Sequence, residues 1–274
     1  MEIKRDHIYS FLISMLLCFL VGCGPSPNTE YDNQYDPDSS SYIPPEAIIT
    51  QGPENNSAVK ESDVLFAWKG NDDKIEYNYK LDENDWSGWT RQMNFNCKYL
   101  DEGKHIFSVK GRYLGRTSEG PTSIRNFIVD AVKGPALMMK PRYVKVSSDK
   151  DSNFVVQFIA EDVNDLMLAH IVLTYDQAML IVVGNAESGD LLSSKGGTVF
   201  FKSKISSGKV VIDTGVGVSN PSGISGSGSI AKLTFKVLKS GNTLLKIGGD
   251  SKIRDSANND IMLSEVVNGI VEIQ

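Results

Sequence analysis

The chain contains 274 residues, of which 41% are hydrophobic and 23% charged, and its formal net charge is −6. This length corresponds to one or two domains with enough apolar residues for packed cores. The acidic balance argues against a nucleic-acid-binding protein, which needs a concentrated basic face to replace the counterions on phosphate. Only three His and three Cys are present, and this argues against a structural zinc site.

Residues 1–22 are predicted to be a signal peptide. Two basic residues precede an almost unbroken apolar run over residues 10–21, which is too short to span about 30 Å of hydrocarbon as a helix but fits a signal-peptide core. The sequence Leu20-Val-Gly-Cys23 resembles a bacterial lipobox. That resemblance implies cleavage before Cys23 and acylation of its thiol, which would anchor the chain in a membrane. An ordinary signal peptide and a short buried helix are the alternatives.

Residues 23–45 are rich in Pro, Ser, Asp and Asn and show no apolar period. Such a segment buries too little surface to offset the entropy of ordering it, so we expect a disordered stalk. The stalk would hold the following domains away from the membrane, outside the cytoplasm. Gly24 stands where, in the lipoproteins this signal resembles, an Asp favours the inner membrane. An outer-membrane or cell-surface location is therefore expected.

Residues 46–132 contain short alternating runs separated by turn residues, and this pattern predicts an antiparallel β-sandwich. Three stretches, 76–82, 86–89 and 100–111, resemble the small Ig-like domains of the Y_Y_Y type. Trp86 and Trp89 are interpreted as one core residue and one turn residue. The alternative is that they form a platform on which sugar rings stack.

Cys97 is predicted to be a small buried apolar side chain. If Cys18 leaves with the signal and Cys23 carries lipid, Cys97 has no intramolecular partner. A reactive thiol is the alternative interpretation.

Residues 136–274 form a second unit of short strands joined by Gly, Asn and Ser turns, which is typical of a sandwich or jelly roll. The whole chain is thus predicted to be all-β. The ordered blocks in this unit resemble a cohesin domain; they are Glu161–Leu166, Leu173–Asp176, Leu180–Val183, Gly189–Leu192, Gly223–Phe235 and Asn268–Ile273. The resemblance implies a nine-stranded jelly roll that binds dockerins, the Ca²⁺-loaded modules of polysaccharide-degrading enzymes.

Strand alternation over residues 168–175 predicts a docking surface. Leu168, His170, Val172 and Thr174 should share the outward face, opposite Ala169, Ile171, Leu173 and Tyr175. Leu168 and Val172 make this face unusually apolar. In well-known cohesins, Asn and Asp at these positions contact the dockerin, so Leu168 and His170 depart from that pattern. A solvated surface histidine is the alternative for His170.

The neighbouring strand, residues 209–214, is expected to contribute Ile212 and Thr214 to the same docking surface. Its register on the first strand is not fixed by the sequence pattern.

Motifs for catalysis and metal binding are incomplete. Asp149–Ala160 lacks the Gly and the final Glu of an EF-hand loop. Asp255–Asp260 could hold Ca²⁺, although an Asx-type turn explains it better. His105 and His170 fall on different predicted domains, which disfavours a Ser-His-Asp site. No catalytic residue, metal site or cofactor is predicted.

The sequence therefore predicts a non-catalytic, surface-anchored scaffold or adaptor. Its second β unit would bind a dockerin-type or other protein partner, and the resemblance to cohesins would link this binding to polysaccharide degradation. A carbohydrate-binding module of the related fold is the alternative, and its partner would be a glycan.

Overall fold

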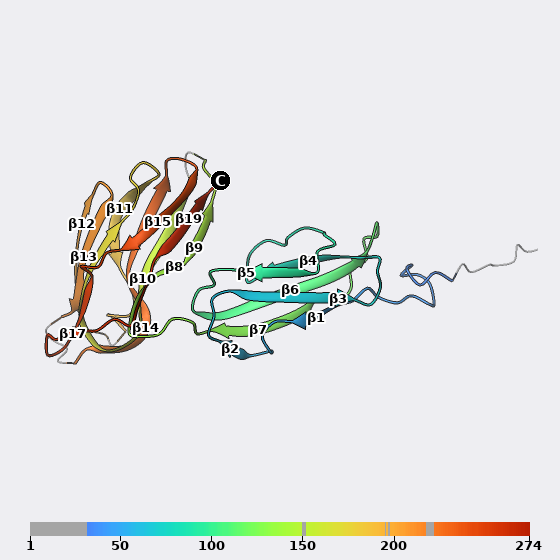
Figure 1. Cartoon of the computed structure of the whole chain (residues 1–274), viewed down its shortest axis with the longest axis horizontal. Helices are drawn as coiled ribbons and strands as arrows, with labels where there is room; N and C mark the ends of the chain where they lie inside the picture. The colour runs from blue at the N-terminus through green and yellow to red at the C-terminus, as the bar shows by residue number, and fades with distance from the viewer. Residues whose placement is uncertain (1–31, 150–151, 195, 197, 218–221) are drawn as a thin grey trace, which may run out of the picture. The chain divides into compact units, whose positions relative to one another are not determined.

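The computed structural model describes residues 32–149, 152–194, 196, 198–217 and 222–274, and within them every regular element is a β-strand (Figure 1). The predicted all-β class is confirmed. None of these residues belongs to a helix that could cross a membrane. The chain divides into two units, residues 1–44 and 45–274. The predicted signal peptide and Cys23 lie outside the described residues.

The described part of the predicted stalk forms successive turns. The N–H of Asp36 donates to the carbonyl of Asn33 at 2.9 Å, and the N–H of Ser39 donates to the carbonyl of Asp36 at 2.9 Å. The side chain of Asn33 also accepts a hydrogen bond from the N–H of Tyr35 at 3.0 Å. Here the structure differs from the expected featureless stalk, because short polar side chains close local turns without a core.

The first half of the second unit is a sandwich of two sheets (Figure 1). One sheet has the order β1-β3-β5 and the other the order β2-β7-β6-β4. All pairs are antiparallel except the parallel pair β2–β7. The strands are β1 (Ala47–Gln51), β2 (Ser57–Val59), β3 (Val64–Gly70), β4 (Ile75–Leu81), β5 (Asn94–Cys97), β6 (Gly103–Tyr113) and β7 (Ser123–Val129).

Aromatic rings from both sheets fill the core of this sandwich. Phe66 of β3 stacks on Phe107 of β6, with ring centroids 4.0 Å apart. Trp68 is also buried, so the tryptophan in this core is Trp68 and not Trp86 or Trp89. Cys97 is a free, buried thiol, and burial raises its pKa to about 12. The prediction of a small buried side chain at Cys97 is confirmed.

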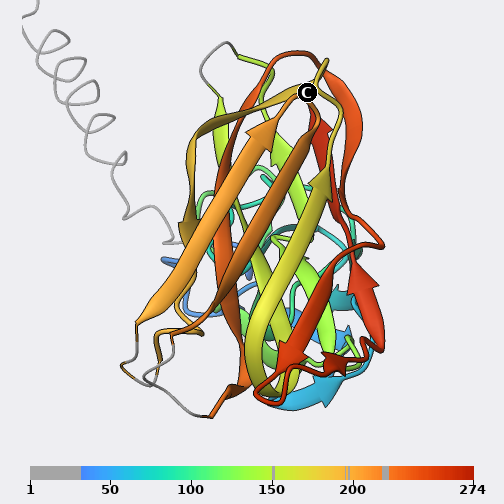
Figure 2. The same cartoon turned by 90° about the vertical axis from the view of Figure 1, so that its left-hand side faces the viewer.

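The second half of this unit is built from β8 to β19, and Figure 2 shows its longer strands running nearly side by side. Their number exceeds the expected nine; two of them, β17 and β18, contain only two and three residues. The strands are β8 (Ala136–Lys140), β9 (Tyr143–Val146), β10 (Asn153–Thr174), β11 (Leu180–Ser188), β12 (Val199–Ser206), β13 (Lys209–Val216), β14 (Ile224–Val237), β15 (Gly241–Ile247), β16 (Lys252–Asp255), β17 (Asp260–Ile261), β18 (Glu265–Val267) and β19 (Gly269–Ile273).

The 22-residue strand β10 organises this half. Its first part pairs with β14 and β8, and its last part pairs with β13, β16 and β15. Between the two parts, Asp162 and Asp165 adopt φ values of 49° and 58°, and the pairing with β14 shifts register. Their N–H groups donate instead to the hydroxyls of Ser227 and Ser225. These bulges redirect the strand, as β-bulges do, so one strand serves two sets of partners.

Most buried apolar side chains of this half belong to one core. They form one cluster that includes Phe158, Leu166, Ile171, Leu173, Ile212, Leu233 and Phe235.

His105 joins the strands of the first sandwich through two acceptors. Its Nδ1 lies 2.7 Å from Oδ2 of Asp82, and its Nε2 lies 2.8 Å from the carbonyl oxygen of Asp101. Only the protonated imidazolium can donate to both at once. Burial lowers the pKa of His105, but the bonds to Asp82 and Asp101 raise it, and the net pKa is above the usual value.

We predict that this contact makes the first sandwich more stable at low pH. A folded-state pKa above the unfolded value of about 6.5 gives stabilisation that is complete near pH 6 and is lost as pH rises through the folded pKa. The melting temperature should therefore fall as the pH rises from about 6 to about 8. Unfolded Cys thiols titrate above this range, so the fall is not due to Cys97. The His105→Gln variant should show a smaller fall, because it lacks the titrating imidazole. Equal slopes for wild type and His105→Gln would contradict the assignment.

Candidate functional site

The last part of β10 lies between β13 and β16 and defines an outer face. Leu168 lies opposite Gly215 of β13 and Arg254 of β16. Gly215 in turn lies opposite Phe200 of β12. Because paired residues on neighbouring strands point to the same side of a sheet, these four positions form one row. We call the solvent side of β12, β13, the last part of β10, β15 where it pairs with that part, and β16 the outer face.

A second row on the outer face is polar. His170 lies opposite Asp213 and Lys252, and Asp213 lies opposite Lys202. The Nδ1 atom of His170 is 2.6 Å from Oδ1 of Asp213, and both side chains are about half exposed. The carboxylate of Asp213 is therefore held in place by the imidazole beside it.

The two rows surround a shallow depression of about 370 Å³, lined by residues that include Leu168, His170, Phe200, Asp213, Lys252 and Arg254. Gly215 contributes to this shape, because a Cβ there would lie 2.5 Å from Cδ2 of Leu168. The glycine lets Leu168 lie close to β13. Leu168 and Phe200 remain 40% and 52% exposed, so apolar side chains are available to a partner.

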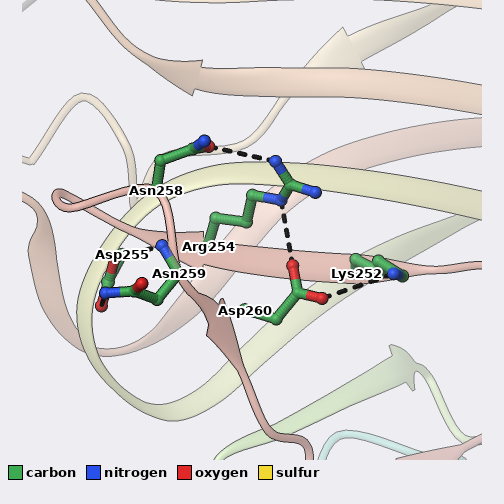
Figure 3. Close-up of polar contacts among 6 residues, drawn as sticks. All are labelled: Lys252, Arg254, Asp255, Asn258, Asn259 and Asp260. Atoms are coloured by element: carbon green, nitrogen blue, oxygen red, sulfur yellow. Dashed lines mark hydrogen bonds and ion pairs between the residues drawn. The ribbon is translucent and has the colours of Figure 1, made fainter.

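One carboxylate, that of Asp260, binds both cations of β16 that line the depression; Figure 3 shows these contacts. Asp260 accepts from Nε of Arg254 at 3.0 Å and from Nζ of Lys252 at 3.3 Å. Arg254 also donates to Oδ1 of Asn258 at 3.1 Å. These contacts hold both cations along the edge of the outer face.

The neighbouring segment is a turn in which the N–H of Asn258 donates to the carbonyl of Asp255 at 3.0 Å. Asp255 accepts hydrogen bonds from the N–H and the Nδ2 group of Asn259, at 2.8 and 3.1 Å (Figure 3). Asn258 takes the left-handed conformation, with φ 64°, which Asn tolerates in turns. Across the described ranges, His, Cys, Asp and Glu side chains form no group of three suited to a metal ion. Residues 255–260 therefore form a turn, but its Asp255 side chain bonds the residue four places on and not two, as it would in an Asx turn.

Three of the four predicted outward residues of β10 are accessible. Leu168, His170 and Thr174 reach solvent, but Val172 is only 5% exposed. Val172 is covered because the connection between β15 and β16 lies against it. Gly248 donates its N–H to the carbonyl of Val172, and Ser251 accepts the N–H of Val172. The expectation that Val172 forms part of the docking surface is therefore corrected.

The expected contribution of β13 is also corrected. Ile212 and Thr214 are 0% and 1% exposed. They lie opposite Ile171 and Ala169, which belong to the inward set of β10, so they point into the core. The outward residues of β13 are the alternate ones, among them Asp213.

Several residues of the outer face were not predicted from the sequence. Phe200, Lys252 and Arg254 come from strands far from β10 in the chain, and pairing alone brings them beside it. One signal was available: in the pair Phe200-Phe201, strand alternation requires one ring to face outward. Phe201 packs against the core, and Phe200 is the exposed one.

Trp86 and Trp89 of the first sandwich lie under cations. Lys110 Nζ is 4.6 Å from the ring centroid of Trp86 and 5.8 Å from that of Trp89, and the guanidinium of Arg112 is 4.1 Å from Trp89. Both rings are half-buried. Because the chain's own cations occupy positions over both rings, the arrangement favours a structural role over a sugar-stacking platform.

We predict that substitutions on the two sides of this sheet will differ in their cost. Ile212→Ala should lower the free energy of unfolding by about 2–5 kcal/mol, because it leaves a cavity in the core. Leu168→Ala should cost about 1 kcal/mol or less, since its side chain is partly solvated. Urea denaturation of both variants measures the difference. Equal costs would contradict the register of β13 on β10.

Comparisons with known proteins identify similarity in the second half of the chain. No curated protein matches the chain. Among solved structures, a non-cellulosomal cohesin from Archaeoglobus fulgidus is 18% identical, covers 51% of this chain and 88% of its own, and has a TM-score of 0.41. The sixth cohesin of scaffoldin B from Acetivibrio cellulolyticus, in complex with the Cel5 dockerin, is 21% identical, covers 52% of this chain and 100% of its own, and has a TM-score of 0.43. The family model described as the cohesin domain matches residues 143–273.

Proposed function

We propose that this protein is a non-catalytic binding protein whose outer face docks a dockerin module or another protein partner. The observation that carries the proposal is the match of the cohesin domain model to residues 143–273, since cohesins are protein-interaction domains. The accessible apolar pair Leu168 and Phe200, together with the depression beside it, gives such a partner a place to bury an anchor side chain.

Binding would join two protein faces without covalent chemistry. An apolar side chain of the partner would enter the depression between Leu168 and Phe200, and polar groups around it would exclude water from the rim. The side chain of His170 is fixed by Asp213, so part of the contact surface is preorganised. Preorganisation lowers the entropy cost of association.

We further propose that Cys23 carries lipid and anchors the chain at the outer membrane or cell surface. The lipobox-like sequence Leu20-Val-Gly-Cys23 supports this. Anchoring would raise the local concentration of a captured partner at the membrane without any new contact. If that partner carries a polysaccharide-degrading enzyme, the protein would act as its surface adaptor.

The binding proposal is tested with the full chain and a panel of recombinant dockerin modules, with Ca²⁺ and with chelator. We expect Ca²⁺-dependent capture of at least one module. Phe200→Asp and Leu168→Asp should each weaken capture by about ten-fold or more, because a carboxylate would be buried in the contact. Ile106→Asp, on the exposed surface of the first sandwich, is the matched control and should bind normally. Retention on insoluble polysaccharide, with no module captured, would instead support the glycan alternative.

The anchoring proposal is tested by labelling bacteria that express the chain with radioactive palmitate. The label should appear on the wild-type protein and be absent from Cys23→Ser, which should also leave the membrane fraction. Cys97→Ser serves as the matched control and should keep the label, because Cys97 is buried. Labelling that persists in Cys23→Ser would contradict acylation at this position.

A further inference from the structure

The outer face is strongly basic, although the chain as a whole carries a net charge of −6. On β12, Phe201 faces the core, so alternation places Lys202 and Lys204 on the outer face. The pairing of β10 places Lys209 and Lys246 beside Thr174, and Lys252 and Arg254 complete the set. The carboxylates in the same rows are Asp213 and Asp260.

The two carboxylates leave most of the positive charge uncompensated. Asp213 is bound by His170, and Asp260 is shared by Lys252 and Arg254. Within the described ranges, the lysines of β12, β13 and β15 form no ion pair; they are Lys202, Lys204, Lys209 and Lys246. Six cations against two carboxylates leave a surplus of positive charge on one face.

We infer that the partner of the outer face is a protein whose contact surface is acidic and presents an apolar side chain. This inference rests on the proposed function and adds the chemistry of the partner. Docking a basic contact surface here would bring like charges together, which costs binding energy, whereas carboxylates would steer the partner and fix its orientation.

The depression favours a protein over an acidic polysaccharide. Its wall includes the exposed side chains of Leu168 and Phe200, and a sugar chain rich in hydroxyl and carboxylate groups would cover them poorly. A single Leu, Ile or Phe on the partner would bury both. The cations Lys202, Lys252 and Arg254 would then meet carboxylates placed around that anchor.

The test uses the full chain and two helical peptides of equal length that share one stripe of Leu. One peptide carries Glu at its remaining exposed positions, and the other carries Lys. We expect the Glu peptide to bind at least about ten-fold more tightly by fluorescence anisotropy, and its affinity to fall as salt rises. Equal binding of the two peptides, or tighter binding of the Lys peptide, would overturn the inference.

A charge-reversed variant assigns the preference to the outer face. Lys202→Glu combined with Lys252→Glu should remove or reverse the preference for the Glu peptide. The control combines Lys69→Glu with Lys98→Glu, which makes the same change in net charge at exposed positions of the first sandwich. If both double variants lose the preference equally, it reflects overall charge and the inference fails. Melting curves of both establish that they are folded.

Polygalacturonate, an acidic polysaccharide, is the third probe. Binding that is tighter than that of the Glu peptide and insensitive to Phe200→Asp would overturn a protein partner.

The dockerin panel separates this inference from the proposed function. Capture of a module that is unaffected by Lys202→Glu with Lys252→Glu would refute the acidic partner but leave the binding function intact. Binding of the Glu peptide without capture of any module would refute only the dockerin-type partner.

Discussion

The alternation of side chains along the last part of β10, beyond the bulges at Asp162 and Asp165, is the constraint on which the candidate binding surface depends. A strand has only two faces, so each residue that enters the core commits its neighbours to the opposite side. β10 pairs with five strands. The residues of β10 that face the core therefore decide which residues of those strands face it. Ile171 places Ile212 in the core, and His170 places Asp213 on the outer face. The core and the candidate binding surface are thus two consequences of one register.

How far the sequence predicts this arrangement differs from strand to strand. The side of β10 that faces solvent was predictable, because residues 168–175 include polar His170 and Thr174 on one side only. In β13, the run Val210-Val-Ile212 is apolar at every position, so either side of this strand could face the core. The pairing with β10 decides between them. Charged Lys209 and Asp213 lie on the same side of β13, and this was the signal that favoured the observed register.

The burial of Val172 could not be predicted from alternation. Alternation places Val172 on the outward side of β10, but a connection from another part of the chain covers it. Gly248 allows this connection to lie close to Val172. Coverage of this kind depends on the path of a loop, which local periodicity does not encode. The same reason explains why Lys252 and Arg254 were missed, since only the pairing of β16 with β10 brings them to the outer face.

The charge of the outer face has a second consequence, for solubility. Within the described residues, β12 pairs with β13 alone, so its other side is an edge with free backbone groups. Phe200 and Ile205 are exposed on this strand, and an apolar edge strand tends to recruit strands from other molecules. Lys202 and Lys204 oppose such stacking, because a second copy would bring like charges together. Replacing these lysines with apolar residues to strengthen a partner contact would therefore promote aggregation before it improved binding.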